Sequence, residues 1–407
     1  VKGFDASRRK GQTASEIDNI ENAVKTKNRV KAALPFLYMK PGLLTWEGRK
    51  YINTSRVRCM QPIAKCPEKL TRFSLGKKYF PFLYEFFKNL FMGEEEGDEY
   101  PKQLSSLLAE LKFFYTNALA GTPRTGHAVF IAGPADKGKT FFASQILGKI
   151  MGGTADASSY LLGEAGGRFT QRIVEKPIAL MDDTGHAGNL RLKLAATNRI
   201  KKLVSNHTMI CEEKNLAAGD VPWTGRIYVL MNTDEISLRI LPDLDSTTRD
   251  KVCLYRATDT RMEWPDRDEM PAILARELPM FCRFLIDMAY PEMFPCNTRF
   301  GPEFYHHPTL VESAQEEGSM LLVELVSNMM ETLGLKDWEG SSQELHTQLE
   351  ITFPETAKAF KPIGMGTRLG LLEKTGKYNI LRSRHPKKRT TMWKFGSPFV
   401  KKVDDFT

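Results

Sequence analysis

The sequence predicts an α/β fold, a parallel sheet flanked by helices, and two observations indicate it. Between residues 126 and 260, short apolar runs alternate with stretches of helical periodicity, as in a parallel sheet with helical crossovers. The candidate strands of this sheet are the runs 128–132, 177–181, 207–211 and 226–231. In addition, a glycine-rich loop separates the first run from a helical stretch, which is where parallel α/β proteins bind phosphate. We assign residues 121–335 to this domain.

The segments on either side of the domain are predicted to form two further units. Residues 1–120 begin with a basic, polar lead and continue with strand-like and helical stretches, so we expect a mixed, largely helical adaptor or collar. Residues 336–407 hold short helical stretches and then two strand-like runs around the basic segment 382–389, which is typical of a small winged-helix module. The chain begins with Val1 rather than Met, and we expect it to be part of a longer protein.

Composition excludes several classes of protein. The 407 residues are 42% hydrophobic and 26% charged, which is ordinary for a globular protein and excludes a disordered chain, a collagen and a disulfide scaffold. No apolar run is long enough for a transmembrane helix, so no membrane partner is expected. The six cysteines are scattered without the spacing of a zinc site, so we expect reduced thiols and no metal bound by cysteine. The net charge of +9 is compatible with nucleic acid binding.

The clearest chemical signal is a phosphate-binding loop. One segment fits the pattern G-x-x-x-x-G-K-[ST] at each defined position: Gly133, Pro134, Ala135, Asp136, Lys137, Gly138, Lys139 and Thr140. Its glycines let backbone N–H groups close around phosphates, and the following helix adds a favourable dipole. We predict that this loop binds ATP, that Lys139 reaches the β and γ phosphates, and that Thr140 holds Mg²⁺ through its hydroxyl.

Two other predicted strands end in polar residues. The run 178–181 ends in Asp182 and Asp183, a Walker B pattern, and adjacent carboxylates at a buried strand end are unfavourable without a cation. We predict that Asp182 holds Mg²⁺ and that Asp183 orients or deprotonates the attacking water. The run 227–231 ends in Asn232, whose amide can sense the γ-phosphate or the water, although Asn-Thr-Asp is also ordinary turn chemistry.

The order and compact spacing of these motifs between Gly133 and Asn232 resemble those of superfamily 3 helicases, the AAA+ motors of small DNA viruses and of phage and plasmid primase–helicase proteins. Residues 44–54 are similar to the segment that leads into the ATPase of the phage and plasmid type, where a primase–polymerase domain often lies upstream. The resemblance implies an AAA+ fold, ATP and Mg²⁺ as cofactors, and a homo-oligomeric ring, for which we expect six subunits. It also implies 3′ to 5′ movement on single-stranded and forked DNA, in a bacterial cytoplasm or, for a eukaryotic virus, in the host nucleus.

The same resemblance suggests the residues that contact DNA. Members of the family carry a β-hairpin between Walker B and the sensor strand, and it projects basic side chains into the channel of the ring. Here Lys214 and its neighbour Asn215 lie at the position of the hairpin tip. A ring of such lysines would track backbone phosphates without regard to base sequence. Other basic residues either contact DNA or lie on solvated surfaces: Arg199, Lys201, Lys202, Lys387, Lys388 and Arg389.

Arg249 lies where the family has its arginine finger. Such a guanidinium stabilises the negative charge that develops on the transferred phosphoryl group in the adjacent subunit. Three other arginines are alternatives for this role: Arg239, Arg256 and Arg261. Aspartates lie close to Arg249 in the sequence, so an ordinary surface ion pair is an alternative role for this arginine.

The predicted function is that of an ATP-dependent DNA helicase motor for replication. One alternative is a P-loop ATPase that translocates, packages or loads DNA without unwinding it. A second is a nucleotide-gated scaffold that recruits a polymerase and hardly hydrolyses ATP, against which the acid pair Asp182 and Asp183 argues.

Overall fold

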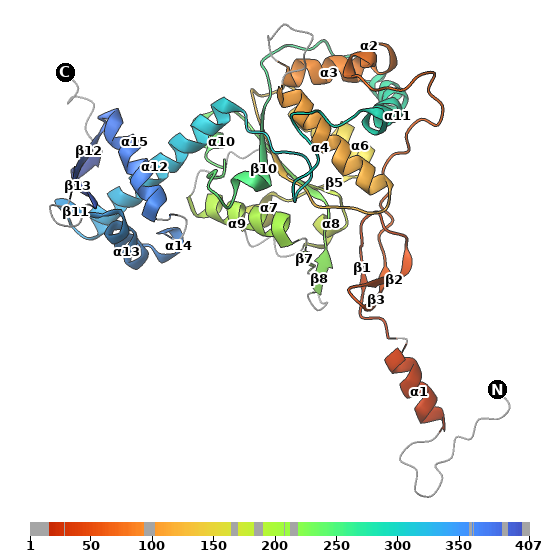
Figure 1. Cartoon of the computed structure of the whole chain (residues 1–407), viewed down its shortest axis with the longest axis horizontal. Helices are drawn as coiled ribbons and strands as arrows, with labels where there is room; N and C mark the ends of the chain where they lie inside the picture. The colour runs from red at the N-terminus through yellow and green to blue at the C-terminus, as the bar shows by residue number, and fades with distance from the viewer. Residues whose placement is uncertain are drawn as a thin grey trace, which may run out of the picture.

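The protein is described here by a computed structural model (Figure 1). Its described residues are 16–27, 29–92, 102–163, 170–182, 190–206, 208–211, 219–357, 360, 362–384 and 390–400. Figure 1 shows a central α/β unit, with a C-terminal unit on one side and a small N-terminal sheet on the other. Among the described residues, no helix combines the length and the apolar character needed to cross a membrane.

A five-stranded parallel sheet forms the centre of the molecule. Its strand order is β10-β4-β9-β6-β5, and every neighbouring pair is parallel. The strands are β4 (Ala128–Ala132), β5 (Thr154–Asp156), β6 (Ile178–Met181), β9 (Arg226–Met231) and β10 (Val252–Arg256). Every residue of β4 and β9 is buried, because both faces of a parallel sheet are covered. The predicted α/β class is confirmed, and the carboxyl ends of these strands share one edge.

One predicted strand of this sheet is wrong. The run 207–211 contributes β7 (Thr208–Cys211), which pairs antiparallel with β8 (Gly219–Pro222) in a separate two-stranded sheet. Only residues 212–218 separate the two strands, and a parallel pair needs a crossover of about a dozen residues or more. The parallel sheet instead gains β5 and β10, which the apolar pattern did not indicate.

The helix after the phosphate loop begins with α5 (Lys139–Phe141), continues as a π-helix (Phe142–Leu147) and ends with α6 (Gly148–Met151). The other helices that follow the sheet strands are α7 (Ser158–Leu162), α8 (Gln171–Val174), α9 (Leu190–Asn206), α10 (Glu235–Leu238) and the 3-10 turn Arg249–Lys251.

Helices from before residue 120 bury their apolar faces in the same core as the sheet. They are α3 (Pro81–Phe91) and α4 (Lys102–Leu119), and α11 (Met270–Asp287) packs with them. Phe87 stacks on Phe281 with ring centroids 5.0 Å apart, and Phe91 contacts both Phe142 and Tyr255. Aromatic side chains therefore join α3 to α11 and to the helix that follows the phosphate loop.

The rest of the N-terminal segment is a small sheet and short helices. The strands β1 (Ala33–Leu34), β2 (Gly42–Trp46) and β3 (Arg49–Asn53) pair in the order β1-β3-β2. Preceding and following them are α1 (Glu16–Lys27), the 3-10 turn Phe73–Leu75 and α2 (Gly76–Tyr79). Figure 1 shows α1 at the far end of this segment, away from the central unit.

The C-terminal unit has its own core and antiparallel sheet. Its elements are β11 (Asp337–Ser341), α13 (Ser342–Thr352), α14 (Pro354–Ala357), α15 (Pro362–Thr375), β12 (Tyr378–Arg384) and β13 (Thr391–Val400), with sheet order β11-β13-β12. Helix α12 (Pro308–Thr332) serves both cores: Leu310 and Ala314 lie in the central core, and Val326 and Met329 lie in the C-terminal one. An ion pair of 2.9 Å between Arg368 and Asp243 also joins the two units.

Candidate nucleotide-binding site

The phosphate loop begins where β4 ends, at the carboxyl edge of the sheet. The path of its backbone requires glycine at two positions. A Cβ on Gly133 would lie 2.5 Å from the Cβ of Ala257, so no other residue fits where the loop passes the segment after β10. Gly138 has φ of 94°, a left-handed conformation that glycine adopts without cost. Asp136 is also left-handed, with φ of 58°. These conformations fold the loop back over the start of α5.

Lys139 lies at the centre of the loop and is only 7% exposed. Its Nζ donates hydrogen bonds to the carbonyl oxygens of Gly133, at 2.8 Å, and Pro134, at 2.6 Å. A third contact, of 3.3 Å, reaches the Oδ1 of Asn232. Burial lowers the pKa of Lys139, and the carboxylates of Asp182 and Asp136 oppose this shift. The loop thus holds a buried ammonium group on oxygen atoms that an anion could replace.

Thr140 and Asp182 meet at the same edge of the sheet. The Thr140 hydroxyl donates a hydrogen bond of 2.8 Å to the Oδ2 of Asp182, which directly follows β6. A hydroxyl and a carboxylate are hard oxygen donors, the type that Mg²⁺ prefers in combination with substrate phosphates. These two side chains therefore fit the predicted metal role. Asp183 lies outside the described residues.

A cavity of about 440 Å³ connects these groups. It is lined by the loop from Ala135 to Phe141 and by Asp182, Leu230, Met231, Asn232 and Trp264. Asn232 follows β9, the strand between β4 and β6, so its amide lies between the loop and the Asp182 strand. The structure thus brings together Lys139, Thr140, Asp182 and Asn232 from three strand ends. It adds Trp264, which the sequence analysis missed because residues 257–269 have no periodicity or motif.

Arg249 lies at the opposite edge of the sheet from this cavity. It belongs to the turn before β10, is exposed, and holds its guanidinium carbon 5.6 Å from the ring centre of Phe304. Because β10 runs parallel to β4, the strand Val252–Arg256 separates Arg249 from the carboxyl edge by roughly 13 Å at about 3.3 Å per residue. In its own chain Arg249 is therefore remote from the cavity.

The alternative arginines lie elsewhere. Arg256 ends β10 at the carboxyl edge and donates a hydrogen bond of 3.2 Å to Thr309 at the start of α12. Arg261 is exposed in the segment that also carries Trp264, and Arg239 directly follows α10. Of these, Arg256 is on the same sheet edge as the phosphate loop.

The basic residues predicted to contact DNA are only partly described. Lys214 and Asn215 lie outside the described residues, between β7 and β8, and Lys387, Lys388 and Arg389 lie outside them between β12 and β13. On α9, the Arg199 guanidinium covers the ring of Tyr160 at 5.1 Å. Lys201 donates a hydrogen bond of 3.1 Å to Thr247, in the turn that leads to Arg249, and Lys202 is exposed.

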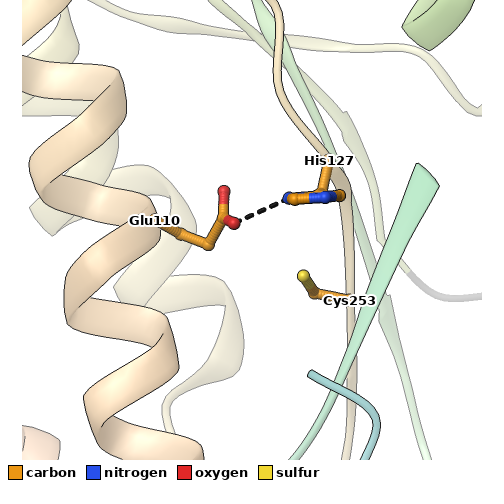
Figure 2. Close-up of side chains that lie close together, drawn as sticks. All are labelled: Glu110, His127 and Cys253. Carbon is orange, nitrogen blue, oxygen red and sulfur yellow. Dashed lines mark hydrogen bonds and ion pairs between the residues drawn. The ribbon is translucent and has the colours of Figure 1, made fainter. Parts of the chain in front are cut away.

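A second cluster of chemical groups is buried near the amino edge of the sheet (Figure 2). The Nδ1 of His127 lies 2.7 Å from the Oε1 of Glu110, and the Cys253 thiol lies beside them, with the possible ligand atoms within 4.8 Å of one another. Burial opposes a charge on His127, but the Glu110 carboxylate raises its pKa well above the usual value. Glu110 also interacts with the buried guanidinium of Arg226, whose charge disfavours a metal cation here. We therefore interpret the cluster as an ion pair that ties α4 to β4.

The five cysteines with described side chains, Cys59, Cys66, Cys253, Cys282 and Cys296, are free thiols. This confirms the expectation of reduced cysteines for those five positions.

Comparisons with known proteins show similarity but do not assign the chain to a characterised family. Residues 131–249 match a family described as a family of unknown function, DUF5906. No curated protein sequence matches the chain. Among solved structures, the apo C-terminal region of NrS-1 aligns at 13% identity and a TM-score of 0.49, over 94% of this chain and 91% of that one. A second NrS-1 structure aligns at 14% identity and a TM-score of 0.48, over 93% and 90%. A JCV helicase with a bound small molecule aligns at 13% identity and a TM-score of 0.26, over 64% and 74%.

Proposed function

We propose that the chain is an ATP-dependent DNA helicase motor that acts in replication as a ring, with six subunits as the expected number. The observation that carries the proposal is the convergence of Lys139, Thr140, Asp182 and Asn232 on one cavity at the carboxyl edge of a parallel sheet. This edge is where open α/β sheets bind their ligands. The proposal is that the cavity binds ATP with Mg²⁺ and hydrolyses the γ-phosphoryl bond.

Each of these side chains has a distinct role in the proposal. Phosphate oxygens replace the two carbonyl groups that hold the Lys139 ammonium, so Lys139 compensates the charge of the β and γ phosphates. Thr140 and Asp182 hold Mg²⁺, which when bound would neutralise charge on the phosphates. Asn232 orients the γ-phosphate or the attacking water through its amide. Asp183 is proposed as the group that orients or deprotonates this water.

The position of Arg249 supports an assembly of several subunits. The guanidinium is exposed at the amino edge of its own sheet, about a strand length from its own cavity. A finger acts on a site in the adjacent subunit, so it must lie on the surface of the subunit that carries it. We propose that Arg249 completes the site of a neighbour, with Arg239, Arg256 and Arg261 as the alternatives.

DNA contact is proposed for the segment between β7 and β8, which contains Lys214 and Asn215. The two strands that flank this segment, β7 and β8, pair antiparallel, and both lie between the Walker B strand β6 and the sensor strand β9 in the chain. We also propose that the C-terminal unit is a winged-helix-like accessory module. Its element order supports this: α12, β11, α13 and α15 precede the paired strands β12 and β13.

The test measures ATP hydrolysis with and without single-stranded DNA, and strand displacement on forked DNA. A helicase motor gives DNA-stimulated turnover and ATP-dependent displacement. Turnover with movement on DNA but no displacement would favour a packaging or loading translocase. Nucleotide binding without DNA-stimulated turnover would favour a scaffold that recruits a polymerase. A protein that binds no ATP would contradict the proposal altogether.

A further inference from the structure

An exposed tryptophan stands at the nucleotide cavity on a base of phenylalanine rings. Trp264 lies between β10 and α11 and lines the cavity, yet 43% of its side-chain and backbone surface is exposed. By contrast, Trp223 and Trp393 are each only 2% exposed. A large aromatic surface left open to solvent at a cavity needs a reason, because burying it would be favourable.

Three phenylalanines hold the indole in place. Its ring centroid lies 5.0 Å from that of Phe141, 6.0 Å from that of Phe86 and 6.2 Å from that of Phe82, with interplanar angles of 80°, 67° and 57°. These are the edge-to-face and tilted arrangements that aromatic pairs prefer. Contacts with three rings restrict the rotamers of Trp264, so little conformational entropy remains to be lost when a ligand packs on it.

The indole is also in direct contact with the phosphate loop. A Cβ placed on Gly138 would lie 3.3 Å from both Cη2 and Cζ2 of Trp264, so the outer edge of the six-membered ring borders the last glycine of the loop. Phe141, which carries the closest of the three rings, follows Thr140 by one residue. One cavity therefore contains the side chains proposed to hold phosphates and an open aromatic surface beside them.

We propose that Trp264 is the stacking platform for the base of the bound nucleotide, with Phe141 as its support. This inference rests on the proposed function, because it assumes that Lys139 and Thr140 hold the phosphates of the same molecule. An indole recognises the π face of a base rather than its hydrogen-bonding edge, so it favours the larger purines over pyrimidines without selecting one purine. The platform contributes to binding of the base, and the loop binds the phosphates.

The test separates the base from the phosphates. Calorimetry compares the affinity for the β,γ-imido analogue of ATP with that for inorganic tripolyphosphate, in the wild type and in Trp264→Phe, Trp264→Leu and Trp264→Ala. Loss of base stacking lowers the affinity for a base by about 5- to 100-fold, so the Leu and Ala variants should lose this much for the ATP analogue. Trp264→Phe should retain most of the affinity, and tripolyphosphate binding should be equal in all four proteins.

Two controls keep the result interpretable. Trp338→Ala removes a tryptophan that stacks on Phe395 in the C-terminal unit, and it should leave both affinities unchanged. Since Phe and Leu both fill space, a difference between these two variants reports the aromatic face even where the Ala variant folds poorly. The wild-type tryptophan fluorescence should fall on binding the ATP analogue but not tripolyphosphate, and this change should be absent in Trp264→Phe.

The outcomes distinguish the two proposals. If the wild type binds neither ligand, the proposed nucleotide site is wrong. If it binds both, but Leu, Phe and Trp at position 264 give equal affinity for the ATP analogue, the site stands and the platform is overturned. If Trp264→Leu lowers the affinity for tripolyphosphate as much as the affinity for the ATP analogue, Trp264 only supports the loop, and the platform is overturned as well.

Discussion

The hydroxyl of Thr140 donates a hydrogen bond to the carboxylate of Asp182 across 2.8 Å, although 42 positions separate the two residues in the chain. The sheet brings them together, because Thr140 follows β4 and Asp182 follows β6, and both strands pair in parallel with β9. A side chain at the end of each strand therefore faces the same edge. This contact joins the phosphate loop to the Asp182 carboxylate in one site, and three of the five predictions below depend on that site.

Lys139→Ala should abolish ATP hydrolysis. The substitution removes the ammonium that contacts Gly133, Pro134 and Asn232, and with it most of the charge compensation at the β and γ phosphates. We expect turnover to fall by at least about 100-fold, as when a charged transition-state contact is lost. Lys149→Ala, which removes an exposed ammonium from α6 in the same helical run, is the matched control and should retain activity. Wild-type turnover in Lys139→Ala would exclude the loop as the nucleotide site.

Asp182→Asn should weaken Mg²⁺ binding and slow hydrolysis, while ATP itself still binds through Lys139. The change keeps the shape of the side chain and its contact with Thr140 but removes a negative charge from the metal site. A titration of turnover against Mg²⁺ should shift to higher concentration and reach a lower maximum. Asp156→Asn alters an exposed carboxylate at the end of the neighbouring strand β5 and should leave the titration unchanged. Equal titrations for Asp182→Asn and the wild type would contradict the metal role.

Arg249→Ala should bind ATP but fail to hydrolyse it, and mixing should restore part of the activity. A finger acts across an interface, so a ring that contains both Arg249→Ala and Lys139→Ala subunits has some sites with an intact lysine beside an intact arginine. Fingers supply on the order of 10³- to 10⁵-fold in rate, so even a minority of complete sites should exceed the background turnover. The readout is ATP turnover in mixtures shown to form joint rings. Joint rings without recovered turnover would point to Arg239, Arg256 or Arg261, or to action within one subunit.

Lys214→Ala should weaken binding of single-stranded DNA and unwinding, while turnover without DNA stays nearly unchanged. Each phosphate contact that is lost lowers the slope of log affinity against log salt by about 0.7 for a single strand. The measurement is DNA affinity over a series of salt concentrations. Lys69→Ala, which removes an exposed lysine far from residue 214 in the sequence, serves as the control. An unchanged slope with unchanged unwinding would place the DNA contact elsewhere, with Lys387, Lys388 and Arg389 as the next candidates.

His127→Gln should change how stability depends on pH. Glu110 raises the pKa of His127 in the folded protein, so the protonated imidazole stabilises the fold fully below its unfolded pKa of about 6.5. This contribution is lost as the pH rises through the folded pKa. Urea unfolding between about pH 6 and 9 should therefore show a free energy of unfolding that falls more steeply in the wild type than in the variant. Parallel pH profiles would indicate that folding does not change the pKa of this imidazole, and would contradict the proposed ion pair.

The sequence was sufficient to predict which strand ends meet at the cavity. Three apolar runs end in the glycine loop, in Asp182 and in Asn232. In a parallel sheet the carboxyl ends of such strands all lie at one edge, and the structure shows this arrangement. The position of Trp264 could not be predicted, because it depends on packing with Phe82 and Phe86 from a helix far away in the chain. Strand β5 was missed because three residues make no pattern. The run 207–211 was assigned to the wrong sheet because an apolar segment does not specify which strand it pairs with.

The sharing of α12 between two cores has a mechanical consequence. Its start is fixed to the edge of the sheet, because the backbone of His307 donates to Leu254 in β10 and Arg256 contacts Thr309. Its far half is embedded in the C-terminal unit. The 25 residues of α12 span about 37 Å, so a tilt of about 10° at the base carries the far end about 6 Å. Strand β10 also joins Arg249 to the cavity edge, so any displacement of that strand is transmitted along a stiff lever arm to the C-terminal unit.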